Sequence, residues 1–190
     1  MTQMLKIPIS EPAYQEAEKR LAEMPVLRGS HRGEAANEVG VLGEVVTEWC
    51  LSALHVPFER ESKTSHDLRI IDKGIVEIKT KDRTVRPLPH YDCSVPLYNH
   101  DHQAVDWYIF VSLFRGGKQG LRRFTEAWIV GCMGRERLQS IGQVWKAGET
   151  DPSNGTKFWT DCINVAIKDL KPFLSAAEIW KSGLVEGTRQ

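Results

Sequence analysis

The chain has 190 residues, of which 41% are hydrophobic and 26% are charged, and its formal net charge at pH 7 is zero. This length suits one domain with a sizeable core, and the balanced charge excludes the overall basic character of avid non-specific nucleic-acid binders. No apolar run reaches the roughly 20 residues of a membrane span, and the N-terminus lacks the charged and apolar regions of a signal peptide. The four cysteines form no C-x-x-C pair and are typical of reduced thiols. We expect a single cytoplasmic domain over residues 1–190 without a membrane partner.

The first part of the chain predicts two helices. Residues 11–24 place Tyr14, Ala17 and Leu21 at helical spacing, and residues 1–30 are interpreted as an N-terminal helical extension. Residues 34–55 repeat apolar side chains every three or four positions, which predicts a longer helix. Gly40 and Gly43 would each cost it up to about 1 kcal/mol relative to alanine. We therefore expect another backbone to approach this helix closely at the glycines.

Residues 66–80 predict a β-hairpin with one apolar and one charged face. With residues 72–74 as a three-residue loop, Ile71 pairs with Ile75, Arg69 with Glu77 and Asp67 with Lys79. A one-residue slip would place apolar and charged residues on the same face. We choose this register because it keeps the two kinds of residue on separate faces. The apolar set is Leu68, Ile70, Val76 and Ile78, and the charged set is Asp67, Arg69, Glu77 and Lys79.

Two carboxylates and an ammonium group on one hairpin face suit a divalent-metal site. Hard oxygen ligands bind Mg²⁺ or Mn²⁺, and a lysine beside the metal can orient water or stabilise charge on a phosphoryl oxygen. The other interpretation is a solvated face with ordinary cross-strand ion pairs.

Asp67 followed ten residues later by Glu77-Ile78-Lys79 resembles the metal-binding core of the PD-(D/E)XK nuclease superfamily. The likeness covers residues 66–80 and one helix, and His66 stands where the superfamily's name has proline. It implies a restriction-endonuclease-like α/β sandwich, with a central mixed β-sheet flanked by helices. It also implies Mg²⁺, replaceable by Mn²⁺, on Asp67, Glu77 and the Ile78 carbonyl, with Lys79 positioning the attacking water or neutralising the transition state.

The helix over residues 34–55 supplies one more candidate through the same resemblance. In many superfamily members a glutamate after a small residue of the first core helix reaches the metal site, and Gly43-Glu44 matches that pattern. On a helical wheel Glu44 and Glu38 lie at opposite borders of the apolar surface, so either could face inward. Glu48 is expected to be solvated.

Residues 83–103 predict a long irregular loop, because Pro87, Pro89 and Pro96 exclude a central strand or a helix interior. A loop of this length indicates a flap over the site. Gln103 of this loop is an expected nucleic-acid contact, and it follows the E-x-K motif as a site glutamine does in some superfamily members. Basic side chains near the hairpin and this loop are the expected phosphate contacts, namely Arg69, Lys81, Arg83 and Arg86.

The remaining chain predicts alternating strands and short helices. Strands are expected at residues 104–114, 122–130 and 163–167, the first of them apolar on both faces and therefore central. A short helix should end near Ile141, and a final helix from Ala176 to Lys181 should be capped by Ser175.

Together these features predict a metal-dependent DNA nuclease, with an endonuclease slightly favoured over an exonuclease. A homodimer is left open, because a small domain could need two copies to cut both strands. Three other classes stay open: a non-catalytic nucleic-acid-binding module, a structural protein that retains the nuclease fold, and another hydrolase. The hydrolase has no support in the sequence, which contains no G-x-S-x-G motif and no cysteine with a catalytic histidine partner by motif.

Overall fold

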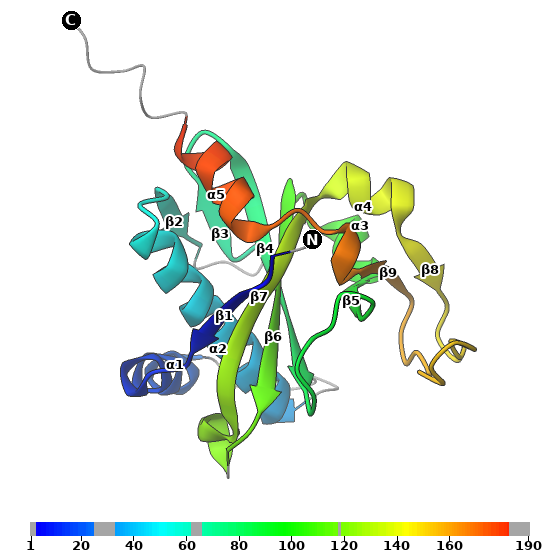
Figure 1. The fold of residues 1–190 in the computed structure, drawn as a ribbon, viewed down its shortest axis with the longest axis horizontal. Helices are drawn as coiled ribbons and strands as arrows, with labels where there is room; N and C mark the ends of the chain where they lie inside the picture. The colour runs from blue at the N-terminus through cyan, green and yellow to red at the C-terminus, as the bar shows by residue number, and fades with distance from the viewer. Residues whose placement is uncertain (1–2, 25–32, 62–65, 118, 183–190) are drawn as a thin grey trace, which may run out of the picture.

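The computed structural model describes residues 3–24, 33–61, 66–117 and 119–182 (Figure 1). Residues 25–30 of the predicted N-terminal extension lie outside the described residues. Short 3₁₀ helices are labelled η. The elements in chain order are β1 (Leu5–Pro8), α1 (Glu11–Glu23), α2 (Gly33–Ala53), β2 (Phe58–Arg60), β3 (Leu68–Ile70), β4 (Gly74–Arg83), β5 (Asp92–Pro96), α3 (Leu97–His102), β6 (Trp107–Arg115), η1 (Gly120–Arg123), β7 (Phe124–Gly134), α4 (Arg135–Ile141), β8 (Gln143–Trp145), β9 (Cys162–Ala166), η2 (Ile167–Asp169) and α5 (Phe173–Lys181).

The strands form two sheets. The larger has six strands in the order β1-β7-β6-β4-β3-β2, and it is mixed because β4 runs parallel to β6 while the other pairs are antiparallel. The smaller has the order β5-β9-β8 and is antiparallel. Figure 1 shows the larger sheet curling between α1, α2 and α5 on one side and the smaller sheet with α4 on the other. The protein is therefore mixed α/β, with a mixed six-stranded sheet flanked by helices, as predicted.

The hydrophobic core is divided in two by the larger sheet. One cluster joins α1, α2 and α5 to the sheet and includes Leu42, Ile78 and Ile109. The other joins the opposite face to the smaller sheet and includes Tyr108 and Phe110. Strand β6 contributes to both clusters, which explains why its sequence is apolar on both faces.

The β3–β4 hairpin has a different register from the predicted one. Leu68 pairs with Val76, and Ile70 pairs with Gly74, so the pairing is shifted by two residues. Because side chains alternate with a period of two, this shift preserves both faces. The loop is residues 71–73, and Asp72 adopts its positive φ of 60°, which aspartate tolerates better than most residues. The prediction assigned the glycine to the loop, whereas Gly74 begins the strand.

The predicted irregular loop over residues 83–103 is wrong, because β5 and α3 lie within it. Strand β5 is at the edge of the smaller sheet and pairs only with β9. Pro96 ends that strand and precedes α3, so its missing N–H removes no central ladder bond. A proline at the end of an edge strand therefore does not exclude a strand.

Two further boundaries differ from the sequence prediction. Strand β1 was not predicted, and it pairs with β7 at the edge of the larger sheet. Helix α5 begins at Phe173 directly after Pro172, so Ser175 lies inside the helix and does not cap it. Proline at the helix start is favourable because the first N–H groups have no partner within the helix.

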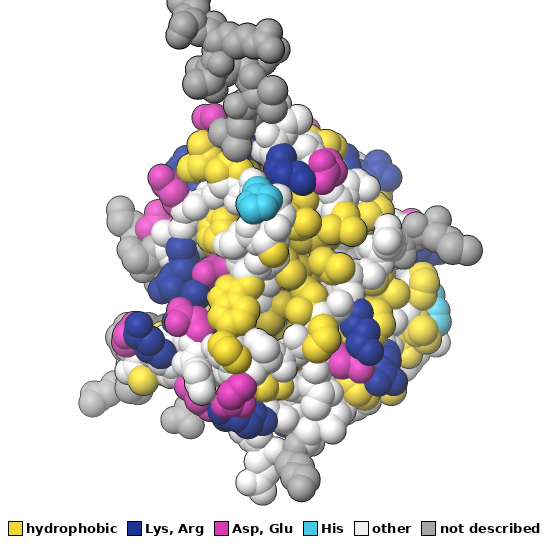
Figure 2. Space-filling view, turned by 60° about the vertical axis from the view of Figure 1, so that its left-hand side comes forward, with side chains coloured by type: hydrophobic (Ala, Val, Ile, Leu, Met, Phe, Trp, Pro, Cys, Tyr) yellow, Lys and Arg dark blue, Asp and Glu magenta, His cyan; other side chains and the backbone are white. Residues whose placement is uncertain are grey.

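Helix α2 leaves part of its predicted apolar stripe exposed. Trp49 is 41% exposed, and it lines a groove of about 270 Å³ together with Ile7, Ile9 and Val46. Figure 2, which brings the side with α1 and α2 forward, shows hydrophobic side chains gathered over the middle of this face with charged side chains around them.

Candidate functional site

Asp67 is held at the edge of β4, where β3 stops pairing with it. The Asp67 N–H donates to the Val76 carbonyl at 3.2 Å. The N–H of Ile78, two residues further along β4, donates to Asp67 Oδ2 at 2.6 Å. The carboxylate thus replaces the missing strand as an acceptor, which fixes it beside β4.

Glu77 and Lys79 are neighbours on the face of β4 that looks away from α2. Lys79 Nζ lies 2.7 Å from Glu77 Oε1, and the two side chains are 17% and 8% exposed. The second carboxylate oxygen, Glu77 Oε2, is buried without a hydrogen-bond partner among the described residues. Buried polar atoms are normally paired, so this oxygen is available to a group from outside the chain.

Glu44 lies on α2, near enough to Asp67 and Glu77 for their charges to interact, and α2 packs very closely on β4 beside it. A Cβ added at Gly43 would lie 2.0 Å from Thr80 Oγ1, whereas one added at Gly40 would meet no atom within 4 Å. The close approach expected at both glycines therefore occurs at Gly43 alone, and it is to a side chain. Glu44 is the next residue along the helix.

The three carboxylates repel one another. Burial, then the charges of Glu48 and Glu77, raise the pKa of Glu44 from 4.5 to about 7. Burial, followed by the charges of Glu77 and Glu44, raises the pKa of Asp67 well above its ordinary value. A cluster of this kind favours protonation or a bound cation. The structure therefore brings Asp67, Glu77 and Lys79 together at β4, with Glu44 near enough for its charge to act on Asp67.

The other two glutamates of α2 have partners elsewhere. Glu38 forms an ion pair with Arg123 of η1, so of the two alternatives only Glu44 interacts with Asp67. Glu48 is 7% exposed and binds both terminal nitrogens of Arg20 at 2.7 Å. The expectation that Glu48 is solvated is wrong, because α1 covers it and supplies a guanidinium group.

The carboxylates do not form a ready-made metal cage. Among the residues that the structure describes, no group of three or more His, Cys, Asp or Glu side chains is placed to hold a metal ion. One oxygen of Asp67 accepts the Ile78 N–H, and one oxygen of Glu77 accepts from Lys79. The donors that remain are hard oxygens, including the unpartnered Glu77 Oε2, and their chemistry suits Mg²⁺.

The predicted phosphate contacts are mostly engaged within the chain. Arg83 donates to Ser112 Oγ and the Asp92 carbonyl, both at 2.9 Å, and Lys81 Nζ lies 3.4 Å from that carbonyl. Arg86 is paired with Glu126 through two nitrogens. Their contact with DNA stays a prediction, as does that of Arg69, which is exposed on β3.

Gln103 ends α3, and its side-chain Oε1 is buried without a partner among the described residues. Its backbone carbonyl accepts from Arg135 Nη1 at 2.6 Å. A contact of this glutamine with nucleic acid stays a prediction.

His100 and Tyr108 form a buried polar pair that the sequence does not predict. His100 Nδ1 lies 2.9 Å from the Tyr108 hydroxyl, and Tyr108 is the β6 residue in register with Glu77. Burial, and to a smaller extent the Glu77 charge, raise the pKa of Tyr108 to about 12. The only sequence signal was a tyrosine on an otherwise apolar strand, which is weak because tyrosine is common in cores.

No protein-family profile matches the chain, and a search of curated proteins finds none with significant similarity. None of the described helices is long and apolar enough to cross a membrane.

Proposed function

We propose that this protein is a metal-dependent nuclease that hydrolyses DNA phosphodiester bonds, with Glu44, Asp67, Glu77 and Lys79 as its site. The observation that carries the proposal is the pair of largely buried carboxylates held at β4, with Asp67 accepting the Ile78 N–H and Glu77 in contact with Lys79. Glu44 of α2 lies near enough for its charge to contribute to the raised pKa of Asp67. Like charges brought together by the fold oppose folding, and such arrangements are characteristic of functional sites. The motif's resemblance to PD-(D/E)XK nucleases supplies the substrate class and the restriction-endonuclease-like fold.

Mg²⁺ is the cofactor that suits these donors, and Mn²⁺ should substitute for it. Asp67 and Glu77 would hold it, with Glu44 and the Ile78 carbonyl as further ligands. The unpartnered Glu77 Oε2 is the available donor that supports this assignment. When bound, the metal supplies Lewis acidity and lowers the pKa of a coordinated water.

The chain's own residues have separate roles in this proposal. Lys79 fixes the Glu77 carboxylate through their 2.7 Å contact, and its positive charge can orient water or stabilise charge developing on a phosphoryl oxygen. Glu44, whose pKa is about 7, exists in both protonation states near neutral pH and can therefore take up or return a proton.

The proposal is tested by incubating supercoiled plasmid, linear duplex and single-stranded DNA with Mg²⁺ or Mn²⁺, with EDTA as the metal-free control. Lys79→Ala should reduce cleavage by about 100-fold or more while retaining metal binding, and Asp67→Ala should lose both. Lys19→Ala, on the exposed side of α1, is the matched control and should leave cleavage unchanged. Equal cleavage by the wild type and Lys79→Ala would contradict the role of the lysine.

A non-catalytic DNA-binding module is the second candidate. It is favoured by the Lys79–Glu77 ion pair, which already satisfies both charges, and by the lack of a preformed ligand group among the described residues. Binding of duplex DNA without turnover in any metal would support this alternative.

A further inference from the structure

A second cavity lies apart from the carboxylates, where β6 begins and β7 runs into α4. Its volume is about 510 Å³, which is within the range of pockets that bind small organic molecules. None of Glu44, Asp67, Glu77 and Lys79 lines it. The pocket therefore has its own lining, although its Trp107 pairs with Val76, the residue before Glu77.

One wall of this pocket is aromatic. Trp107 lines it, and the indole is held by a T-shaped contact with Trp180 at a centroid distance of 5.9 Å. Trp180 is 2% exposed and belongs to the core, so it anchors the indole in place. Met133 adds a buried apolar surface. A fixed aromatic ring in an open pocket is suited to stacking against a planar ligand.

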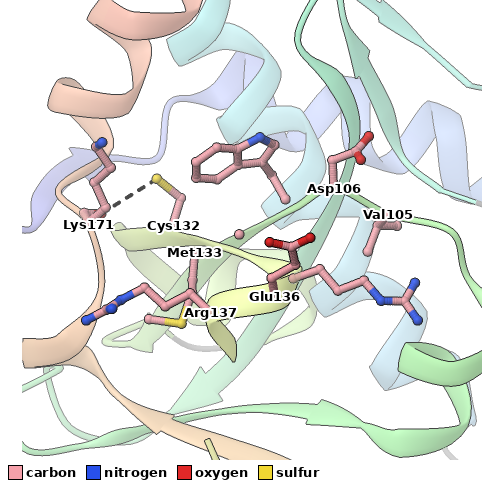
Figure 3. Close-up of a pocket in the computed structure, with 10 residues that line it drawn as sticks. Val105, Asp106, Cys132, Met133, Glu136, Arg137 and Lys171 are labelled. Atoms are coloured by element: carbon pink, nitrogen blue, oxygen red, sulfur yellow. Dashed lines mark hydrogen bonds between the residues drawn. The ribbon is translucent and has the colours of Figure 1, made fainter. Parts of the chain in front are cut away.

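The other walls carry acidic and basic side chains that have no partner among the described residues. Glu136, Arg137 and Lys171 line the pocket. Within the described residues their side chains form no hydrogen bond or ion pair, whereas the Lys171 backbone pairs with Cys132. Figure 3 shows the Glu136 carboxylate in the middle of the pocket, with Arg137 and Lys171 on one side of it. Asp106, on the other side, accepts the Ile75 N–H at 2.7 Å through one carboxylate oxygen.

This combination discriminates between classes of ligand. A simple anion would be attracted by Arg137 and Lys171 but repelled by the central Glu136. A basic peptide side chain would be attracted by Glu136 but repelled by the two cations. A ligand with a planar ring, hydrogen-bond donors at one end and a negative group at the other satisfies all three charges at once.

We propose that this pocket binds a nucleotide whose base carries an exocyclic amino group. The base stacks on Trp107, its amino group donates to the Glu136 carboxylate, and its phosphate binds Arg137 and Lys171. A carboxylate accepting from the amino group of cytosine is an established form of base recognition. The nucleotide could be free or belong to a DNA single strand, and both present the same chemistry. The inference does not depend on the proposed nuclease activity.

The test is calorimetric titration of the full chain with dCMP, dTMP, deoxycytidine and inorganic phosphate in EDTA, which keeps the proposed metal site out of the measurement. We expect dCMP to bind at least ten times more tightly than dTMP, which lacks the amino group, and than phosphate. Deoxycytidine should bind more weakly than dCMP because it lacks the phosphate. A short single-stranded oligonucleotide ending in dC, added as a competitor, distinguishes the sources: displacement of dCMP points to a DNA strand, and no displacement points to the free nucleotide.

Variants separate the two halves of the pocket. Glu136→Gln should bring the affinities for dCMP and dTMP to within about twofold of each other. The double variant Arg137→Gln with Lys171→Gln should weaken dCMP at least tenfold and leave deoxycytidine unchanged. Lys19→Gln is the control and should bind as the wild type does. Absence of dCMP binding by the folded wild type, binding of phosphate as tightly as dCMP, or indifference to these variants would each overturn the proposal.

Discussion

At the scale of single residues, burial and neighbouring carboxylates disfavour the ionised form of Glu44. Its folded-state pKa is about 7 against an ordinary 4.5, so the folded protein binds its proton more tightly than the unfolded chain does. The contribution of Glu44 to the free energy of unfolding is therefore highest below about pH 4.5, and it falls as the pH rises to about 7. Above that range the buried charge opposes folding.

Glu44→Gln should remove this effect, because glutamine has nearly the same shape without the charge. In metal-free buffer at pH 8 we expect the free energy of unfolding to rise by roughly 1–3 kcal/mol, and the difference from wild type should shrink toward pH 4. Urea denaturation at several pH values measures it, with Glu59→Gln on exposed β2 as the control. A wild-type pH dependence that persists unchanged in Glu44→Gln would show that Glu44 is not the group responsible.

The site residues also show what a single sequence can reveal. The alternation of the hairpin correctly grouped Asp67, Glu77 and Lys79, although the register was shifted by two residues, because faces depend only on odd and even positions. Periodicity left Glu44 and Glu38 equivalent. What distinguishes them is the position of Arg123, which is 85 residues from Glu38 in the chain, and no local pattern encodes such a contact.

At the scale of elements, the packing of α2 on β4 positions Glu44. The two glycines of this helix have the same chemistry but different surroundings, since Gly43 faces Thr80 and Gly40 faces open space. They provide a matched pair for testing whether the close approach matters.

Gly43→Ala should lower the free energy of unfolding by about 1–3 kcal/mol, because the new methyl group clashes with Thr80. Gly40→Ala should raise it by up to about 1 kcal/mol, since alanine favours the helix. Thermal and urea unfolding measure both effects. Adding Thr80→Ala should relieve most of the loss in Gly43→Ala; if the double variant is no more stable than the single one, Thr80 is not what limits the approach.

The elements that the sequence predicted well are those with long, regular patterns. The 3.6-residue period of α2 and the two-sided apolar run of β6 both correspond to observed elements. The smaller sheet was missed as a unit because its strands have three to five residues and come from distant segments. The prolines of residues 83–103 do not predict β5, because proline excludes a central strand but is compatible with the end of an edge strand, and no local pattern shows that β5 lies at an edge.

At the scale of the whole molecule, the net charge is zero, but acidic and basic side chains are unevenly distributed over the fold. Many arginines are neutralised by distant carboxylates, as Arg115 is by Asp82 and Arg122 by Glu11 and Glu18. Among the described residues, Glu44, Asp67 and Glu77 have one direct cationic contact, that of Lys79 with Glu77. Overall composition therefore says little about where a cation would bind.

A bound divalent cation should stabilise the whole protein by mass action. At a Mg²⁺ concentration one hundred times its Kd, the free energy of unfolding should increase by about 2.7 kcal/mol, measured as a rise in Tm over a sodium chloride control of equal ionic strength. The rise should be larger at pH 8 than at pH 6, because Glu44 and Asp67, whose pKa values are raised, must lose protons before they bind a metal. Asp67→Ala should abolish it. A Tm that does not respond to Mg²⁺ at pH 8, or that responds equally in Asp67→Ala, would count against a metal site at these carboxylates and favour a structural role for the hairpin charges.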